Sequence, residues 1–455
     1  MRNSTLSKLI SNAKPLWRPI ARASFCKLRP SALRLAGSLA KDGGRPVRDL
    51  RLRPWASVND GNLLRWHFEA RGAFRRIYTA GVEGLPQPQA DRFAELWASY
   101  CGCRYGLLLM HGTDAIRFGL AAALDHDGLE YGGEVIVPNF SFIASASAPL
   151  DRRFGVVFVD VDPTTLLIDP NCVEQAIIPG KTRAIIPVHL FGQPADMTAL
   201  RAIADKHGLK IIEDAAQAHG AMFANRRVGS FGDGGAFSFQ SSKNLACGEG
   251  GALVTNDEQL FRRAYSLHNV GRSRTGKERW QHDTLGWNCR LTEYQAALLI
   301  HRFKMFERLQ ATRAQNFGVL RRLMESISSL EPLVVHPNVQ AHGMYMFVMR
   351  YKSERCGGLS IDRFLEYVQS EGVPVYRAFD ATLSDQPAIK DLAAKHPRYF
   401  RSLATPVANE AAKDTVYIPQ EIFLGTGRDM EDIVAAVNKV ERNFSKRTSQ
   451  HRSNK

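Results

Sequence analysis

The sequence predicts an α/β protein: a mostly parallel β-sheet covered by helices on both faces, followed by a smaller C-terminal α+β domain. Strand and helix patterns alternate regularly between residues 89 and 213, and the strand segments are nearly continuous runs of Ile, Val and Leu. Such runs are typical of strands buried on both faces, and consecutive parallel strands need a crossover, usually a helix. After Ser230 the alternation gives way to short strands and longer helices, which indicates a different second part.

Helical spacing and apolar runs predict the elements of the first part. Between residues 89 and 102, Phe93, Trp97 and Tyr100 recur at helical spacing. Residues 105–110 are instead an apolar run of strand length. The predicted elements are, in order, helix 89–102, strand 105–110, helix 113–124, strand 134–137, helix 141–150, strand 155–160, helix 171–178, strand 183–188, helix 196–207 and strand 209–213.

The second part begins with two short strands that a glycine-rich turn, residues 248–251, separates. The predicted elements are strands 235–239 and 252–255, helix 292–324, strand 344–351, and helices 361–370 and 429–440. We therefore expect the chain to divide into a basic extension (1–41), an α/β domain that holds the cofactor (42–325), a small C-terminal domain (326–440) and a basic tail (441–455).

The net charge of +15 lies mainly at the two ends of the chain. Residues 1–41 contain nine basic and no acidic residues, and residues 441–455 contain five basic and one acidic residue. Because the body is almost neutral, nucleic acid is not an expected partner. The first segment is either a mobile basic extension or an organelle-targeting or membrane-surface arm.

Composition excludes several further classes of protein. Hydrophobic residues make up 44% of the chain and charged residues 23%, as in ordinary globular proteins. The seven cysteines are scattered without CxxC spacing, and the histidines lack metal-ligand spacing, so we expect neither a disulfide framework nor a metal site. The longest apolar runs are of strand length, so no integral membrane segment is predicted. We expect a cytoplasmic protein.

Gly112, Thr113 and Asp114 stand between a predicted strand and a predicted helix. A helix N-terminus leaves backbone N–H groups unpaired and carries partial positive charge, so this segment predicts a phosphate site. The alternative is that Thr113 caps the helix and binds no ligand.

Asp214 lies at the carboxyl end of a predicted buried strand, where open α/β sheets place their ligands. A buried carboxylate must find a partner, because an unpaired buried charge is costly. Either the partner is a ligand, or Asp214 is a helix-capping or ion-paired residue.

Lys243 follows the predicted strand 235–239 and stands close in sequence to the glycine-rich turn. A partly desolvated lysine favours its neutral amine and can form a Schiff base with an aldehyde, although a surface lysine is the default for any single position. A phosphate site, a carboxylate and such a lysine are together what pyridoxal 5′-phosphate requires.

Eight ordered motifs show that the sequence resembles the DegT/DnrJ/EryC1/StrS sugar aminotransferase family, whose fold is aminotransferase fold type I. The resemblance covers about residues 43–440. The motifs occupy residues 111–115, 137–142, 159–163, 188–194, 212–220, 237–243, 248–251 and 288–290. Residues 43–48, 405–408 and 416–419 also resemble the branch that includes aminohydroxybenzoate synthases and keto-cyclitol aminotransferases.

The resemblance implies a role for each matching position. Lys243 would be the catalytic residue, Asp214 would pair with the pyridine nitrogen of the cofactor, and Gln217 would approach the ring hydroxyl. Further cofactor contacts would come from Gly112, Thr113 and Ser238 at the phosphate, Phe142 stacked on the ring, and Asn288 of the neighbouring subunit. His189 and Arg290 would face the substrate, and a homodimer with shared active sites is implied.

The implied activity is a pyridoxal 5′-phosphate-dependent transfer of an amino group from Glu or Gln to a ketone on a sugar nucleotide or cyclitol. Three alternatives stay open. A dehydratase of the same family typically has His where this chain has Lys243. An aminohydroxybenzoate-type synthase keeps the lysine, and a non-catalytic protein that binds the cofactor would not depend on it.

Overall fold

The computed structural model describes residues 38–50, 55, 71–72, 74–75, 77–78, 88–274 and 280–453, with side chains up to residue 444. The predicted basic extension, residues 1–41, lies outside the described residues except for its last four positions. No helix within the described ranges combines the length and the apolar content needed to span a bilayer.

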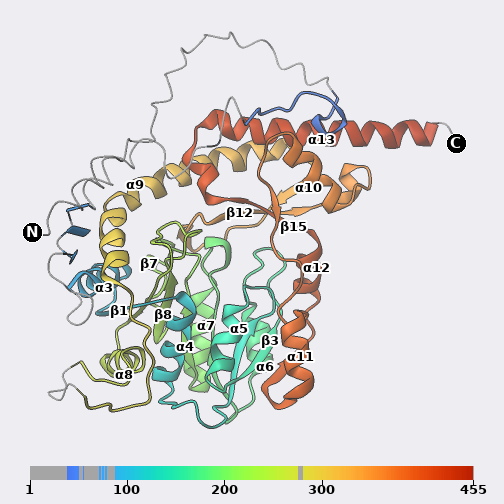
Figure 1. The fold of residues 1–455 in the computed structure, drawn as a ribbon. Helices are drawn as coiled ribbons and strands as arrows, with labels where there is room; N and C mark the ends of the chain where they lie inside the picture. Colours follow the sequence, from blue (N-terminus) through green and yellow to red (C-terminus); the bar gives the residue numbers. More distant parts are fainter. Residues whose placement is uncertain are drawn as a thin grey trace, which may run out of the picture. The chain divides into compact units, whose positions relative to one another are not determined.

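The described chain is built around an eight-stranded sheet with the strand order β1-β9-β8-β5-β4-β2-β3-β14 (Figure 1). All neighbouring strands pair in parallel except at β9, which is antiparallel to both β1 and β8. The mostly parallel sheet is therefore confirmed. Its strands are β1 (Tyr105–Leu109), β2 (Glu134–Pro138), β3 (Gly155–Val159), β4 (Thr182–Ile185), β5 (Lys210–Asp214), β8 (Gly234–Ser238), β9 (Gly251–Thr255) and β14 (Phe400–Ser402).

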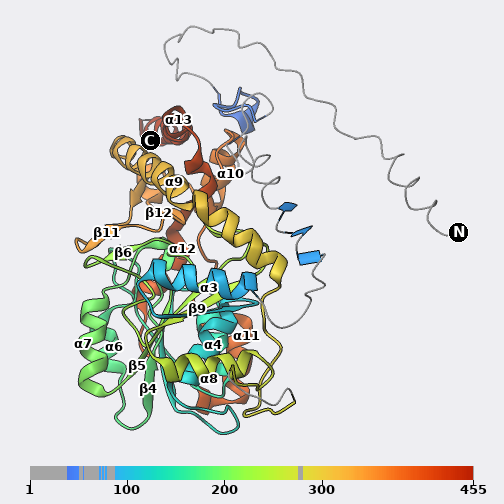
Figure 2. The ribbon, with the colours of Figure 1, turned by 90° about the vertical axis from the view of Figure 1, so that its left-hand side faces the viewer.

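Helices cover both faces of this sheet. Successive strand residues point to opposite sides, so neighbouring residues of one strand contact different helices. Ile212 packs in the cluster that contains the apolar residues of α4 and α8, whereas its neighbour Ile211 packs in the cluster under α6 and α7. Figure 2 shows α3 beside α9 and α6 beside α7. The helices are α3 (Pro88–Cys101), α4 (Gly112–Ala123), α5 (Ala144–Asp151), α6 (Pro170–Ala176), α7 (Met197–His207), α8 (Glu258–His268) and α9 (Glu293–Leu323).

A second, antiparallel sheet with the order β10-β12-β15-β13 forms the C-terminal part. One apolar cluster joins it to α10, α13 and the end of α9. The remaining strands are β10 (Leu330–Pro332), β12 (Met346–Tyr351), β13 (Tyr376–Arg377) and β15 (Thr415–Pro419), and the helices are α10 (Ile361–Ser370), α11 (Pro387–Lys395), α12 (Pro406–Asp414) and α13 (Gly427–Ser453).

The first described residues pack against this C-terminal part and not against the large sheet. Leu39 lies in its apolar cluster, and the Arg48 guanidinium contacts Asp429 at 2.6 Å and Asp432 at 2.9 Å. The Trp55 indole N–H donates to the Gly372 carbonyl. The domain boundaries at residues 42, 326 and 441 stay predictions, and these contacts show that segments distant in sequence share one core.

The remaining elements are short. A three-stranded sheet joins β6 (Met222–Phe223), β7 (Arg226–Arg227) and β11 (Val339–Ala341). Single turns of 3-10 helix are η1 (Ala40–Asp42), η2 (Leu190–Gly192), η3 (Met324–Ser326), η4 (Ser353–Cys356), η5 (Pro397–Tyr399) and η6 (Gln420–Leu424). The predicted helix 141–150 begins later, at Ala144, because residues 141–143 form the turn that leaves β2.

Candidate active site

The predicted cofactor residues meet at one edge of the large sheet. Asp214 and Ser238 are the last residues of the neighbouring parallel strands β5 and β8. Helix α4 begins at Gly112, just after β1, and Phe142 follows the carboxyl end of β2. Ligands of open α/β sheets bind at this edge, so the topology brings together residues that the sequence spreads over about 130 positions.

Asp214 is a buried carboxylate held in a defined orientation. The Ser145 hydroxyl donates to its Oδ2 at 2.8 Å, and the Ala216 N–H donates to its Oδ1 at 3.2 Å. Burial raises the pKa of Asp214, and these two hydrogen bonds and the positive charge of Lys243 oppose that rise. No cation among the described residues bonds directly to the Asp214 carboxylate. A ligand N–H would therefore give its negative charge a partner.

Directly behind Asp214, Glu213 and His189 form a buried pair. The His189 Nε2–H donates to Glu213 at 2.9 Å, and the Ala195 N–H donates to His189 Nδ1 at 3.0 Å. The second carboxylate oxygen of Glu213 accepts the N–H groups of Phe231 and Gly232 at 2.7 Å each.

The predicted contact of His189 with substrate does not fit this arrangement. Its ring is 0% exposed and both ring nitrogens have protein partners. The His189 N–H donates to the Asp214 carbonyl at 3.0 Å, so His189 supports the strand end that presents Asp214.

The N-terminus of α4 fits a phosphate group. His111 occupies the N-cap position and no side chain caps the helix, so the alternative of a Thr113 cap is wrong. The helix end lies against β8: a Cβ at Gly112 would come within 2.8 Å of the Ser238 Cβ. Glycine therefore leaves uncapped N–H groups next to a serine hydroxyl, a donor set suited to an anion.

Lys243 lies in the turn after β8 and is half-buried. Its Nζ is 3.2 Å from the Tyr345 hydroxyl and 4.3 Å from the centre of the Tyr345 ring. The same hydroxyl lies 3.0 Å from the Ser242 Oγ. The next residue, Asn244, donates to the Gly343 carbonyl at 2.6 Å and so ties the lysine turn to the chain just before Tyr345.

Tyr345 is the site residue that sequence reasoning missed. It is 7% exposed and lies in the segment that leads into β12. This segment is distant in sequence from every motif of the large sheet. The only signal was a tyrosine within a predicted strand, and that pattern is common in protein cores.

Gln217 and Phe142 lie just beyond the carboxyl ends of β5 and β2. The Phe191 N–H donates to Gln217 Oε1 at 2.7 Å, which leaves the Gln217 NH₂ group as the donor toward a ligand oxygen. Phe142 is 57% exposed, which is unusual for a phenylalanine beside a buried strand end. An aromatic ring stacked on it would cover this side chain.

Asn288 and Arg290 lie on the segment that runs beside the end of β1. The Met110 N–H donates to the Cys289 carbonyl between them, and Arg290 donates to the Asn269 side chain at 2.9 Å. Partial burial, followed by the charge of Arg272, lowers the pKa of Arg290. Within the described part of a single chain, Asn288 is exposed and no hydrogen bond joins it to Lys243 or Ser238.

The residues at this edge fit pyridoxal 5′-phosphate in three separate ways. The uncapped α4 terminus and Ser238 suit its phosphate, Asp214 suits a protonated ring nitrogen, and Lys243 suits its aldehyde. Each part of the cofactor therefore has a matching group on a different element.

Comparisons with known proteins show which proteins this chain is similar to. The model of the DegT/DnrJ/EryC1/StrS aminotransferase family matches residues 70–438. An L-glutamine:2-deoxy-scyllo-inosose aminotransferase of Streptoalloteichus tenebrarius is 34% identical over 89% of this chain and 97% of its own.

Two solved structures are also similar over most of the chain. DesV of S. venezuelae has a TM-score of 0.73 and 30% identity, covering 87% of this chain and 99% of its own. A 3-amino-5-hydroxybenzoic acid synthase has a TM-score of 0.73 and 28% identity, covering 82% of this chain and 96% of its own.

Proposed function

The chain belongs to the DegT/DnrJ/EryC1/StrS aminotransferase family, and on that premise we propose that it transfers an amino group from L-glutamine to a cyclitol ketone. It is a pyridoxal 5′-phosphate-dependent aminotransferase of fold type I. The observation that carries the choice of substrates is the 34% identity, over 89% of the chain, to an enzyme named for glutamine and 2-deoxy-scyllo-inosose.

When bound, the cofactor supplies an aldehyde that can take up an amino group and a ring that can accept electrons. Lys243 would hold the aldehyde and then move a proton at its Nζ. Tyr345 orients that nitrogen, because its hydroxyl lies within hydrogen-bond reach of it. Asp214 would keep the ring nitrogen protonated, since its buried carboxylate is stabilised by an N–H partner.

Lys243 also helps to distinguish amino transfer from the alternative activities. A dehydratase of this family typically has His at this position, so the lysine favours amino transfer. An aminohydroxybenzoate-type synthase stays a second candidate, because one structure of that activity is 28% identical over 82% of this chain. The two activities differ in their acceptor. The aminotransferase would use a saturated cyclitol ketone, and the synthase would use the precursor of an aromatic ring.

We further propose that the active form is a homodimer. Exposed apolar side chains support this, since Trp280 is 73% exposed and Leu285 71%. A second copy covering this surface would bring its Asn288 to the phosphate site, as the family resemblance implies. The cytoplasmic location stays a proposal that rests on the scattered cysteines, which are unpaired among the described residues.

A stepwise assay of the purified holoprotein tests the proposed donor and acceptor. L-Glutamine should convert the absorbance of the bound aldehyde to that of its amine form, and 2-deoxy-scyllo-inosose should then restore it. Lys243→Ala should lower the rate about 1,000-fold or more, because it removes the proton-moving group. Lys395→Ala, a change at an exposed lysine of α11, is the matched control and should keep the wild-type rate.

Two results would contradict the proposal. If glutamine converts the cofactor but no cyclitol ketone restores it, the acceptor is wrong. If neither glutamine nor glutamate changes the spectrum of the holoprotein, the transfer reaction itself is wrong.

A further inference from the structure

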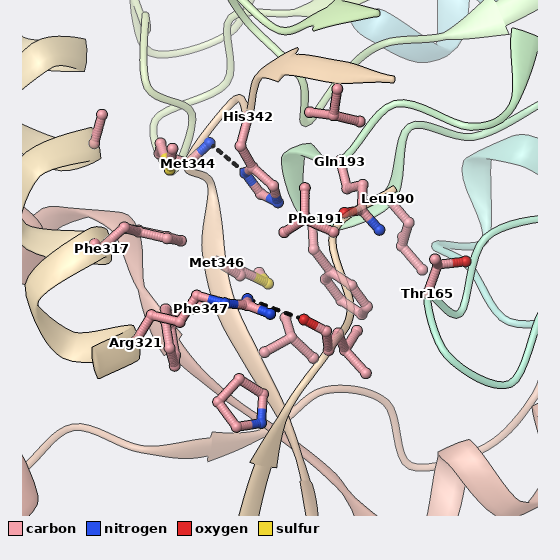
Figure 3. Close-up of a pocket in the computed structure, with 17 residues that line it drawn as sticks. Thr165, Leu190, Phe191, Gln193, Phe317, Arg321, His342, Met344, Met346 and Phe347 are labelled. Atoms are coloured by element: carbon pink, nitrogen blue, oxygen red, sulfur yellow. Dashed lines mark hydrogen bonds between the residues drawn. The ribbon is translucent and has the colours of Figure 1, made fainter. Parts of the chain in front are cut away.

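A cavity of about 280 Å³ lies behind the segment that carries Tyr345 (Figure 3). Tyr345 points to Lys243, whereas His342, Met344 and Met346 line the cavity. Helix α9 and the η2 loop supply much of the remaining wall, so the cavity is separate from the cofactor site but shares a segment with it.

Most of the wall is apolar, but the buried Gln193 and the half-buried His342 each turn one polar atom without a protein partner among the described residues toward the cavity. Gln193 is 4% exposed and its NH₂ group donates to the Val334 carbonyl at 3.1 Å. Its carbonyl oxygen has no hydrogen-bond partner among the described residues. Figure 3 shows the Gln193 amide and the His342 ring pointing into the cavity.

The hydrogen bond that His342 accepts determines which of its ring nitrogens can bind a ligand. The Met344 N–H donates to its Nδ1 at 2.9 Å, so the ring proton resides on Nε2. Nε2 has no partner among the residues that the structure describes. The cavity therefore presents one donor, His342 Nε2–H, and one acceptor, Gln193 Oε1.

The charge of the wall favours an uncharged ligand. Burial, followed by the charge of Arg321, lowers the pKa of His342 to about 4, so the imidazole is neutral at pH 7. None of the 17 described residues that line the cavity is an Asp or Glu, which disfavours a cation. Arg321, whose Nη1 donates to the Leu333 carbonyl at 3.0 Å, is exposed, so solvent screens its charge and it attracts an anion only weakly.

We propose that this cavity binds a neutral, mostly apolar, ring-sized molecule that carries a hydrogen-bond donor beside an acceptor, as a primary amide on an aromatic ring does. The volume is sufficient, because an apolar cavity of about 150 Å³ accepts benzene. The amide N–H would pair with Gln193 and the amide carbonyl with His342. Gln193 Oε1 and His342 Nε2 would each thereby gain a hydrogen-bond partner.

Ligand-observed NMR on the full-length holoprotein tests the proposal with three probes of one shape. Benzamide has the donor and the acceptor, toluene has neither, and benzamidine is a cation with donors only. Benzamide should bind about tenfold more tightly than toluene, since two neutral hydrogen bonds distinguish them. Benzamidine should show no binding to the cavity.

Two variants locate the binding. Gly318 lines the cavity on α9, and a Cβ there would meet only Arg322 Nη1, at 3.7 Å, so Gly318→Leu should fill the space and abolish benzamide binding. Ala311→Leu, at an exposed position of the same helix outside the cavity, is the matched control and should bind normally.

Gln193→Leu tests the chemistry of the contact. It removes the acceptor while keeping a side chain of similar size, so benzamide should lose its advantage over toluene. The proposal is overturned if benzamide does not bind the wild-type protein, if it binds Gly318→Leu as tightly, or if benzamidine binds as well as benzamide.

Discussion

His219 is an imidazole buried among aromatic rings close to the cofactor site. Its ring is 0% exposed and packs against Trp97, Phe237 and Phe239 at centroid distances of 5.6 to 5.8 Å. Burial, followed by the charge of Lys243, lowers the pKa of His219 to about 3. The folded protein therefore holds this ring neutral at a pH where the unfolded chain would protonate it.

This shift predicts that the protein loses stability in mild acid. Below the unfolded pKa of about 6.5, the unfolded state binds a proton that the folded state refuses until the pH approaches 3. The free energy of unfolding should thus fall as the pH drops from 7 to 4, by about 1.4 kcal/mol per pH unit for each such histidine. His268 and His342, whose pKa values are lowered to about 4, add to the effect.

Urea unfolding of the cofactor-free protein at pH 7 and pH 5 measures this dependence. His219→Phe keeps an aromatic ring in the cluster and should reduce the loss between the two pH values. His396→Phe replaces an exposed histidine and should leave the loss unchanged. An equal loss in wild type and His219→Phe would rule out the assigned role of His219.

At the scale of elements, the closest approach in the site is that of α4 to the strands of the large sheet. A Cβ at Gly112 would lie 2.8 Å from the Ser238 Cβ, and a Cβ at Gly251 would lie 2.2 Å from the His111 carbonyl oxygen. Both distances are too short for real carbon atoms. Glycine at these positions lets the helix terminus reach β8 and β9, where the proposed phosphate site lies.

Gly112→Ala should therefore separate α4 from β8 and weaken the phosphate site. We expect at least a tenfold loss of cofactor affinity, with a loss of about 1–3 kcal/mol in stability from overpacking. Equilibrium dialysis with pyridoxal 5′-phosphate and urea unfolding measure the two effects. Gly427→Ala is the matched control, because Gly427 also begins a helix but a Cβ added there would have no neighbour within 4 Å. Unchanged cofactor affinity in Gly112→Ala would contradict the assigned phosphate site.

Length decides the outcome for many, but not all, of the predicted elements. Helix 361–370 and most strands of the large sheet were predicted to within three residues at each end, because several turns or a full apolar run carry the pattern. The strands β6, β7, β10, β11, β13 and β14 were missed, since two or three residues show no period. The five-residue strand β15 and the helices α8, α11 and α12 were also missed, although Asp257 caps the first turn of α8.

At the scale of the whole molecule, the proposed shared site predicts complementation between two inactive variants. If Asn288 serves the partner's phosphate site, a mixed dimer of Lys243→Ala and Asn288→Ala chains contains one site with both residues intact. Random mixing should then restore about a quarter of the wild-type sites, because half of the dimers are mixed and each has one intact site.

Activity of co-refolded chains, compared with each variant alone, measures this restoration. No restoration in a preparation whose mixed dimers are confirmed by mass would show that Asn288 acts within its own chain. Recovery from Lys243→Ala mixed with Asp214→Asn is the matched negative control and should be absent, since both residues belong to one chain's site.

The sequence by itself determined the fold class and the family and predicts a chemistry centred on Lys243 and Asp214, because periodic burial and short motifs are local properties of a chain. Only the tertiary structure decided that Tyr345, 102 positions from Lys243, lies 3.2 Å from its amine. It also decided that His189 is enclosed behind Asp214 and that a cavity lies behind Tyr345. Such features depend on which distant segments pack together, and no local pattern records that pairing.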